Sequence, residues 1–251
     1  MPTQELQYWD KGLRLRGVLA CEAAPAAPRP GVLVVHEGLG LNAHIVEQTQ
    51  RVARLGYVAL AADMFGEGRQ VRGPPGTQLQ EARALVGALR ADPAKLRARA
   101  RAAVAALASL PQVDRGRLGA IGFCFGGSVV LELARDGAPL RAVVSVHGVL
   151  STPRPAAVGG VRASLLVLTG ADDPLAPAQE VAAFAEEMRT AKVADWQVIS
   201  YGNALHGFTN PSADGSILPS ARYDARASAR AWRAMQGFLA ETLDAEATNA
   251  C

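Results

Sequence analysis

The sequence predicts an α/β fold in which a mostly parallel central sheet is flanked by helices and preceded by an N-terminal antiparallel hairpin. From residue 31 onwards, short apolar runs alternate with helical stretches, the pattern of parallel strands joined by right-handed crossovers. The first of these runs, at 31–38, is continuous rather than alternating, which is typical of a strand covered on both faces. Because no repeat or linker divides the chain, we expect residues 1–251 to form a single domain.

The strands are indicated by their apolar patterns. Polar and apolar residues alternate over 5–21, which predicts a β-hairpin, and a Pro- and Ala-rich loop at 23–30 joins it to the main sheet. The later strands are expected at 31–38, 57–63, 117–123, 141–148, 163–170 and 195–202.

The helices are indicated by apolar residues recurring every three to four positions. Asn42 is expected to cap the first helix, and Asp92-Pro93 divides the second stretch into two helices because proline cannot continue a helix. Residues 64–76 are rich in Gly and Pro and predict a loop. The helical stretches are 43–55, 77–110, 125–136, 177–190 and 222–244.

Composition excludes several classes of protein. With 251 residues, 49% hydrophobic and 20% charged, the chain can bury a sizeable core. The net charge of +3 is small and acidic residues are interspersed, so we expect no nucleic-acid partner. The longest apolar runs are strand-length and the N-terminus lacks a basic segment followed by an apolar one, so we expect a cytoplasmic protein without membrane contact.

The three cysteines are widely spaced and include no CxxC, so neither a disulfide framework nor a zinc site is expected. Cys124 is distinguished from Cys21 and Cys251 by its frame of glycines, G-x-C-x-G at 122–126, between a strand and a helix. This is the pattern of a nucleophile on a strained strand-to-helix turn, with cysteine in place of serine.

The chemistry of such a turn explains its residues. Small neighbours at Gly122 and Gly126 let the flanking chains approach, and the N-terminus of the following helix favours a thiolate at Cys124. The backbone N–H of Phe125 would be one oxyanion donor. The alternative role for Cys124 is that of a buried, inert cysteine.

A thiol nucleophile needs a base and an acid. His206 follows the last predicted strand in YGNALHGFTN, where the order nucleophile, acid, histidine places the base. The alternative is a surface-loop histidine. Asp172 and Asp173 follow a strand between them, and we favour Asp173, at the G-x-x-D position before Pro174, to orient the imidazole. The other aspartate is then a turn or cap residue.

Glu37 ends the first buried strand, where a carboxylate is costly unless it is paired or functional. The carboxyl ends of parallel strands form the ligand-binding edge of such sheets, so Glu37 is a candidate site residue. The Gly38 N–H would be the second oxyanion donor. The alternative for Glu37 is an exposed loop carboxylate.

The remaining polar residues near strand ends receive structural interpretations. His36 and His147 end strands and could line the same crevice, but packing or hydrogen bonding within the structure is the favoured reading. His44 is expected on a helix surface, and Asp63 is interpreted as structural.

Four motifs together resemble the dienelactone hydrolase family (carboxymethylenebutenolidase-like) of the α/β-hydrolase superfamily over about residues 10–240. They are HEGLG at 36–40, GFCFGG at 122–127, GADDPLAP at 170–177 and LHGFTNP at 205–211. The resemblance implies a single-domain α/β-hydrolase fold, no cofactor and a Cys-His-Asp triad. It also implies that Glu37 interacts with the thiol and helps produce the thiolate when substrate binds.

One position departs from that family. Members that process dienelactone carry an arginine four residues after the catalytic histidine to bind the substrate carboxylate, whereas this chain has Asn210. Asn210 therefore argues against dienelactone itself as the substrate. The expected substrates remain the broader class of esters and lactones. A carboxylate contact could instead come from Arg69, Arg72, Arg83 or Arg90.

The expected function is hydrolysis of a small ester or lactone through an acyl-thioester on Cys124, without cofactor or metal. The same thiolate could attack an activated phosphotriester as a promiscuous substrate. Two rival functions are a thiol-redox protein and a non-catalytic binding module on this scaffold. The sequence leaves monomer and homodimer open.

Overall fold

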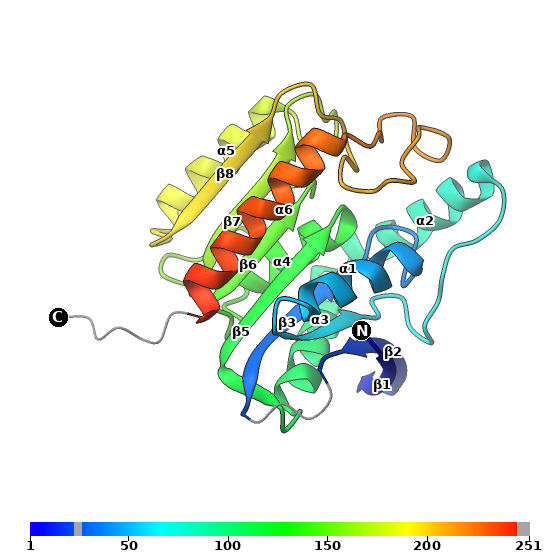
Figure 1. Cartoon of the computed structure of the whole chain (residues 1–251). Helices are drawn as coiled ribbons and strands as arrows, with labels where there is room; N and C mark the ends of the chain where they lie inside the picture. The colour runs from blue at the N-terminus through cyan, green and yellow to red at the C-terminus, as the bar shows by residue number, and fades with distance from the viewer. Residues whose placement is uncertain (23–26, 245–251) are drawn as a thin grey trace.

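The computed structural model, which describes residues 1–22 and 27–244, contains an eight-stranded sheet with the order β1-β2-β4-β3-β5-β6-β7-β8 (Figure 1). Strands β1 and β2 form the antiparallel hairpin, β2 is antiparallel to β4, and the remaining pairs are parallel. The predicted fold class is therefore confirmed. The strands are β1 (Thr3–Asp10), β2 (Leu13–Ala20), β3 (Arg29–Val35), β4 (Val58–Ala62), β5 (Val113–Phe123), β6 (Ala142–Val146), β7 (Ser164–Gly170) and β8 (Trp196–Tyr201).

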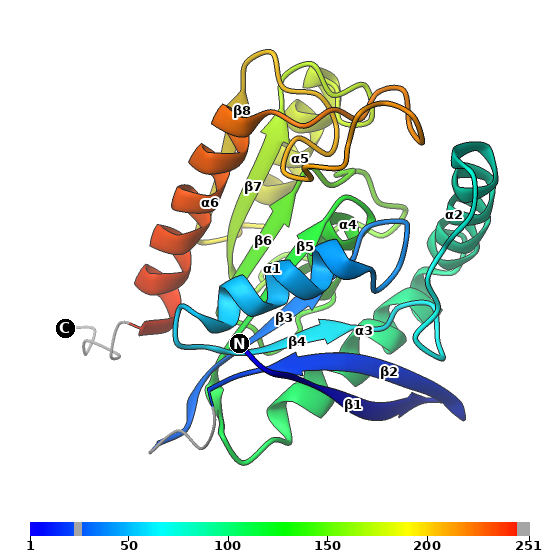
Figure 2. The same ribbon diagram turned by 45° about the vertical axis from the view of Figure 1, so that its right-hand side comes forward.

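Helices cover both faces of the sheet (Figure 2). Helices α1 and α6 pack on one face, and α3, α4 and α5 pack on the other. Within residues 1–22 and 27–244, no helix is long and apolar enough to cross a membrane. The helices are α1 (Ala43–Ala53), α2 (Pro75–Arg90), α3 (Pro93–Ala108), α4 (Phe125–Arg135), α5 (Ala178–Thr190) and α6 (Ala225–Leu239), followed by a short π-helix η1 (Ala240–Asp244).

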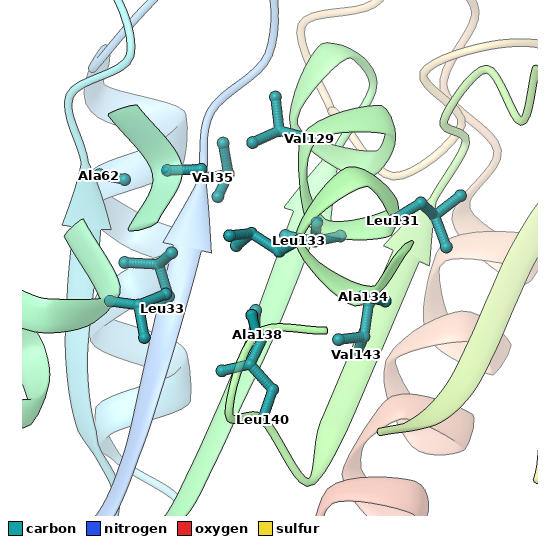
Figure 3. Packing of buried hydrophobic residues seen from close by; sticks show 14 of the residues in the cluster. Leu33, Val35, Ala62, Val129, Leu131, Leu133, Ala134, Ala138, Leu140 and Val143 are labelled. Atoms are coloured by element: carbon teal, nitrogen blue, oxygen red, sulfur yellow. The ribbon is translucent and has the colours of Figure 1, made fainter. Parts of the chain in front are cut away.

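The continuous apolar strands are explained by this two-sided cover. Side chains of α4, including Val129 and Leu133, pack against Leu33, Val35 and Val143 of the sheet (Figure 3). Each such side chain contributes about 1.5–3 kcal/mol when it is fully buried. The turn at Cys124, which precedes α4, is thus attached to a helix packed against the hydrophobic core.

Element boundaries differ from the sequence expectations at a few ends. Strand β5 begins at Val113 rather than 117, because its first residues pair with the start of β3 before the register shifts after Pro30. Helix α6 begins after Asp224, whose carboxylate caps the Ala227 N–H, and the expected 222–244 helix ends as the π-helix. The break at Asp92 is confirmed, whereas residues 23–26 of the predicted loop lie outside the described residues.

The parallel strands bring the candidate residues to one edge of the sheet. Glu37 follows β3, Cys124 follows β5, and Asp173 and His206 lie in the loops after β7 and β8. Because β3, β5, β7 and β8 run parallel, the carboxyl ends of these strands lie at the same edge of the sheet.

Candidate active site

Cys124 occupies a strained turn between β5 and α4. Its φ of 53° is positive, a conformation that non-glycine residues rarely adopt. A Cβ at Gly122 would overlap the carbonyl of Gly126, and a Cβ at Gly126 would overlap the carbonyl of Val35. The two glycines therefore let the strand, the turn and the helix approach as closely as they do, and the turn holds the thiol above the sheet edge.

A continuous hydrogen-bond chain joins sulfur, imidazole and carboxylate. His206 Nε2 lies 3.0 Å from Cys124 Sγ, and His206 Nδ1 lies 2.8 Å from Asp173 Oδ2. The second oxygen of Asp173 accepts the Leu175 N–H at 2.8 Å. His206 and Asp173 are each 2% exposed, whereas Asp172 is exposed. The structure therefore places Asp173, the favoured aspartate, against His206 and leaves Asp172 in solvent.

The surroundings of His206 favour its protonated form. Burial lowers its pKa, but the charge of Cys124 and the hydrogen bonds to Asp173 and Cys124 outweigh burial and raise the pKa well above the usual value. An imidazolium 3.0 Å from the sulfur stabilises a thiolate there. The arrangement can therefore supply a thiolate nucleophile and an adjacent proton donor.

Glu37 does not face solvent as a loop carboxylate, since it is only 7% exposed. Its Oε2 accepts a hydrogen bond of 2.7 Å from Asn210 Nδ2. The Asn210 Oδ1 accepts the Ser212 N–H at 2.9 Å, and this contact fixes which end of the amide faces Glu37. A neutral amide, and not a guanidinium, thus holds the Glu37 carboxylate in the cavity that Cys124 also lines.

A cavity of about 470 Å³ opens over the sulfur and is lined by Cys124, His206, Glu37, Gly38 and Phe125, among others. Phe125 opens α4, so its N–H has no partner within that helix. Both expected oxyanion donors therefore belong to residues that face the same cavity as the thiol.

One wall of the cavity includes an apolar face of α2, formed by Leu79, Ala82 and Val86. A Cβ placed on Gly38 would lie 3.7 Å from both the Ala82 Cβ and a Val86 methyl group. Helix α2 is thus packed against the loop of the expected oxyanion donor. Sequence reasoning did not assign this face to the site, because the residues that α2 faces depend on how the chain folds.

The arginines considered above separate into two groups. Arg69 pairs with Glu81, and Arg72 donates to Gln70, so both are occupied outside the cavity. Arg83 and Arg90 line the cavity from α2 and are exposed.

The interpretation of His44 as a surface residue is wrong. His44 is half-buried, lines the cavity and packs its ring edge against Phe123, with ring centroids 6.3 Å apart. Its position as the second residue of α1 gave no signal, because the side of α1 that faces the site depends on how this helix packs in the folded chain.

The other histidines and Asp63 are buried and hydrogen-bonded. His36 Nδ1 donates to the Glu37 carbonyl at 2.6 Å, and its Nε2 accepts the Met64 N–H at 3.2 Å. The Asp63 carboxylate accepts several backbone N–H groups that shape the following loop, as a structural role requires. His147 is hydrogen-bonded to the Cys124 backbone and to Thr209 in the loop that carries His206.

No metal or second thiol joins this site in the part of the chain that the structure describes. Residues 1–22 and 27–244 contain no group of three or more His, Cys, Asp or Glu side chains that could hold a metal ion. Cys21 follows β2 and is not among the residues of the cavity, whereas Cys251 lies outside the described residues.

The family model of the dienelactone hydrolase family matches residues 15–243. The chain belongs to the dienelactone hydrolase family. The resemblance found in the four motifs is therefore confirmed, and the chain is a hydrolase of this family.

Relatives of this dienelactone hydrolase family member extend over most of its length. A crystal structure of a dienelactone hydrolase-like promiscuous phosphotriesterase from metagenomic libraries is 41% identical, with a TM-score of 0.88 over 96% of this chain and 98% of that one. An uncharacterized protein of Caenorhabditis elegans is 43% identical over 156 residues, 59% of this chain and 94% of the relative. A protein of Synechocystis named "putative carboxymethylenebutenolidase" is 28% identical over 89% of this chain and 90% of its own.

Proposed function

We propose that this dienelactone hydrolase family member cleaves carboxylic ester or lactone bonds with Cys124 as nucleophile, His206 as base and acid, and Asp173 as the group that orients the imidazole. The observation that carries the proposal is the hydrogen-bond chain of 3.0 and 2.8 Å that opens into the 470 Å³ cavity. The family membership supports the same class of reaction.

The proposed reaction begins when the Cys124 thiolate attacks the carbonyl carbon and forms a C–S bond. The Gly38 and Phe125 N–H groups stabilise the resulting oxyanion, each contributing roughly 3–4 kcal/mol when well placed. The C–O bond then breaks, and His206 gives its proton to the leaving alkoxide. Water, deprotonated by His206, attacks the acyl-thioester and releases the acid, which returns the sulfur as thiolate.

Glu37 modulates this chemistry through its charge. Asn210 holds Glu37 with a neutral amide, so this contact brings no positive charge to that side of the cavity. A negatively charged group close to the scissile bond would be repelled there. We therefore propose substrates whose reacting end is uncharged, with an apolar acyl or alcohol group lying along α2.

The test is hydrolysis of p-nitrophenyl butyrate by wild-type protein, Cys124→Ala and the matched control Cys21→Ala. We expect Cys124→Ala to lose turnover while its far-UV circular dichroism stays unchanged, and Cys21→Ala to keep full activity. Mass spectrometry of quenched wild-type reactions should show the acyl adduct on Cys124. Turnover that survives in Cys124→Ala would reject the mechanism.

A second candidate activity is attack on an activated phosphotriester. It is supported by the 41% identical neighbour described as a promiscuous phosphotriesterase and by the apolar cavity, which suits a neutral triester. The thiolate would form an S–P bond as the aryloxide leaves. The same three proteins assayed with diethyl p-nitrophenyl phosphate test this activity: Cys124-dependent release of p-nitrophenolate supports it, and release equal to that of Cys124→Ala rejects it.

A further inference from the structure

His147 follows β6 and is completely buried between the nucleophile turn and the loop that carries His206. Its Nδ1 lies 3.1 Å from the Cys124 backbone nitrogen, whose N–H is shared with the Val146 carbonyl at 2.9 Å. Its Nε2 lies 2.8 Å from Thr209 Oγ1, three residues after the catalytic histidine. One imidazole therefore connects two segments that come from different strands.

The donors and acceptors define the tautomer of this ring. A backbone N–H can only donate, so Nδ1 of His147 accepts and carries no proton. The proton of the neutral ring is then on Nε2, which donates to the Thr209 hydroxyl. Only this one form of the ring makes both contacts.

The backbone at His147 is held in an unusual conformation. Its φ is 40°, in the left-handed region that bulky residues rarely adopt, although its own N–H still donates to the Leu168 carbonyl at 2.7 Å. The ring packs edge-on against the His206 ring with centroids 5.4 Å apart, and against Phe208 with centroids 5.2 Å apart. Strain at a buried position persists only where the surroundings enforce it, and here they aim the ring at the two segments of the site.

We propose that His147 is a positioning residue that ties the Cys124 backbone to Thr209 and so keeps His206 Nε2 within hydrogen-bonding distance of the Cys124 sulfur. The effect of His147 on catalysis rests on the proposed function, whereas its two hydrogen bonds, to Cys124 and to Thr209, are properties of the fold. The Asp173 contact orients the His206 ring from behind, and the His147 tie fixes the distance of its loop from the nucleophile turn.

Three titratable groups face this ring. They are His206 from the loop after β8, Cys124 from the nucleophile turn and His44 from α1. Burial first, and then the charges of His206 and His44, lower the pKa of His147 well below its usual value. His147 therefore stays neutral while His206 beside it carries the proton of the reaction.

The contact to Thr209 can be cut while the contact to Cys124 is kept. In His147→Asn the amide oxygen takes the position of Nδ1 and can still accept from Cys124, while the contact to Thr209 is lost. Asparagine also tolerates the positive φ. Thr209→Val removes the same contact from the other side, and Thr209→Ser, which keeps the hydroxyl, is the matched control.

The readouts are the rate of Cys124 alkylation by iodoacetamide at pH 7 and kcat and KM for p-nitrophenyl butyrate. We expect His147→Asn and Thr209→Val each to lower the alkylation rate and kcat about fivefold, with KM and the far-UV spectrum unchanged and Thr209→Ser equal to wild type. The double variant should lose no more than either single variant, because both cut the same contact.

Two results would overturn the tie: alkylation at the wild-type rate in Thr209→Val, or losses that multiply in the double variant. Alkylation needs no turnover, so it tests the tie even for a protein without esterase activity. Absence of Cys124-dependent hydrolysis in the wild type would count against the proposed function alone.

Discussion

Asp172 and Asp173 are adjacent in sequence but lie in opposite environments, which makes them a matched pair for mutation. Asp173 is 2% exposed and contacts His206, whereas Asp172 is exposed. Asp173→Asn removes the charge that helps to raise the pKa of His206, and the amide can present the wrong group to Nδ1. We expect kcat for p-nitrophenyl butyrate to fall roughly 10³–10⁴-fold, with Asp172→Asn close to wild type.

The same pair predicts the pH dependence of thiol reactivity. The pKa of His206 lies well above its usual value, so its imidazolium beside Cys124 persists above about pH 6.5 and is lost as pH rises through the folded-state pKa of His206. In Asp173→Asn the protonated imidazole should be lost at lower pH, and alkylation of Cys124 at pH 6–7 should slow. Identical alkylation profiles in both aspartate variants would contradict the role of Asp173.

At the scale of single residues, the sequence predicts those site residues that are marked by their immediate neighbours in the chain. Cys124 is recognisable from its glycines, and the structure shows why a Cβ at either glycine would clash. His44 and Thr209 were not found, because their part in the site depends on which way α1 and the loop after β8 turn their side chains in the folded chain.

Helix α2 is the element that should set the preference for acyl length. Its apolar face lines the cavity, and Leu89 is its only buried residue, so substitutions on that face should change the pocket more than the stability. We expect Val86→Asp to lower kcat/KM for p-nitrophenyl octanoate roughly tenfold relative to the acetate, since apolar chain atoms would lose their contact with the methyl groups of α2.

The control for this helix is Ala84→Asp, which adds the same charge at an exposed position that is not among the residues of the cavity. It should leave the ratio of octanoate to acetate hydrolysis unchanged. Equal ratios in both variants would show that α2 does not contact the acyl chain. The periodicity of residues 77–110 predicts the helices but not this contact, because only the fold places α2 beside Gly38.

At the scale of the whole molecule, the order and direction of the strands explain why the site residues lie together at one edge of the sheet. The alternation of strands and helices predicts a parallel sheet, and hence that residues after β3, β5, β7 and β8 meet at one edge. It does not predict the strain at His147 or the shift of register after Pro30, because these follow from packing between distant segments.

The same buried edge makes the stability of the molecule depend on pH. Burial lowers the pKa of His36 and, together with neighbouring histidines, that of His147. Below about pH 6.5 each ring binds fewer protons when the protein is folded than when it is unfolded, so the free energy of unfolding falls as pH falls, by up to about 1.4 kcal/mol per pH unit for each ring.

His206 acts in the opposite sense but outside this window, because its raised pKa gives a contribution that is fully present below about pH 6.5 and is lost only at higher pH. Urea unfolding at pH 5.0, 5.5, 6.0 and 6.5 measures the slope. His147→Asn has no titrating ring at this position. The slope of its unfolding free energy against pH should therefore be smaller than in the wild type by the contribution of the His147 ring. An unchanged slope would mean that His147 is protonated in the folded protein. This result would contradict the neutral tautomer through which His147 joins Cys124 to Thr209.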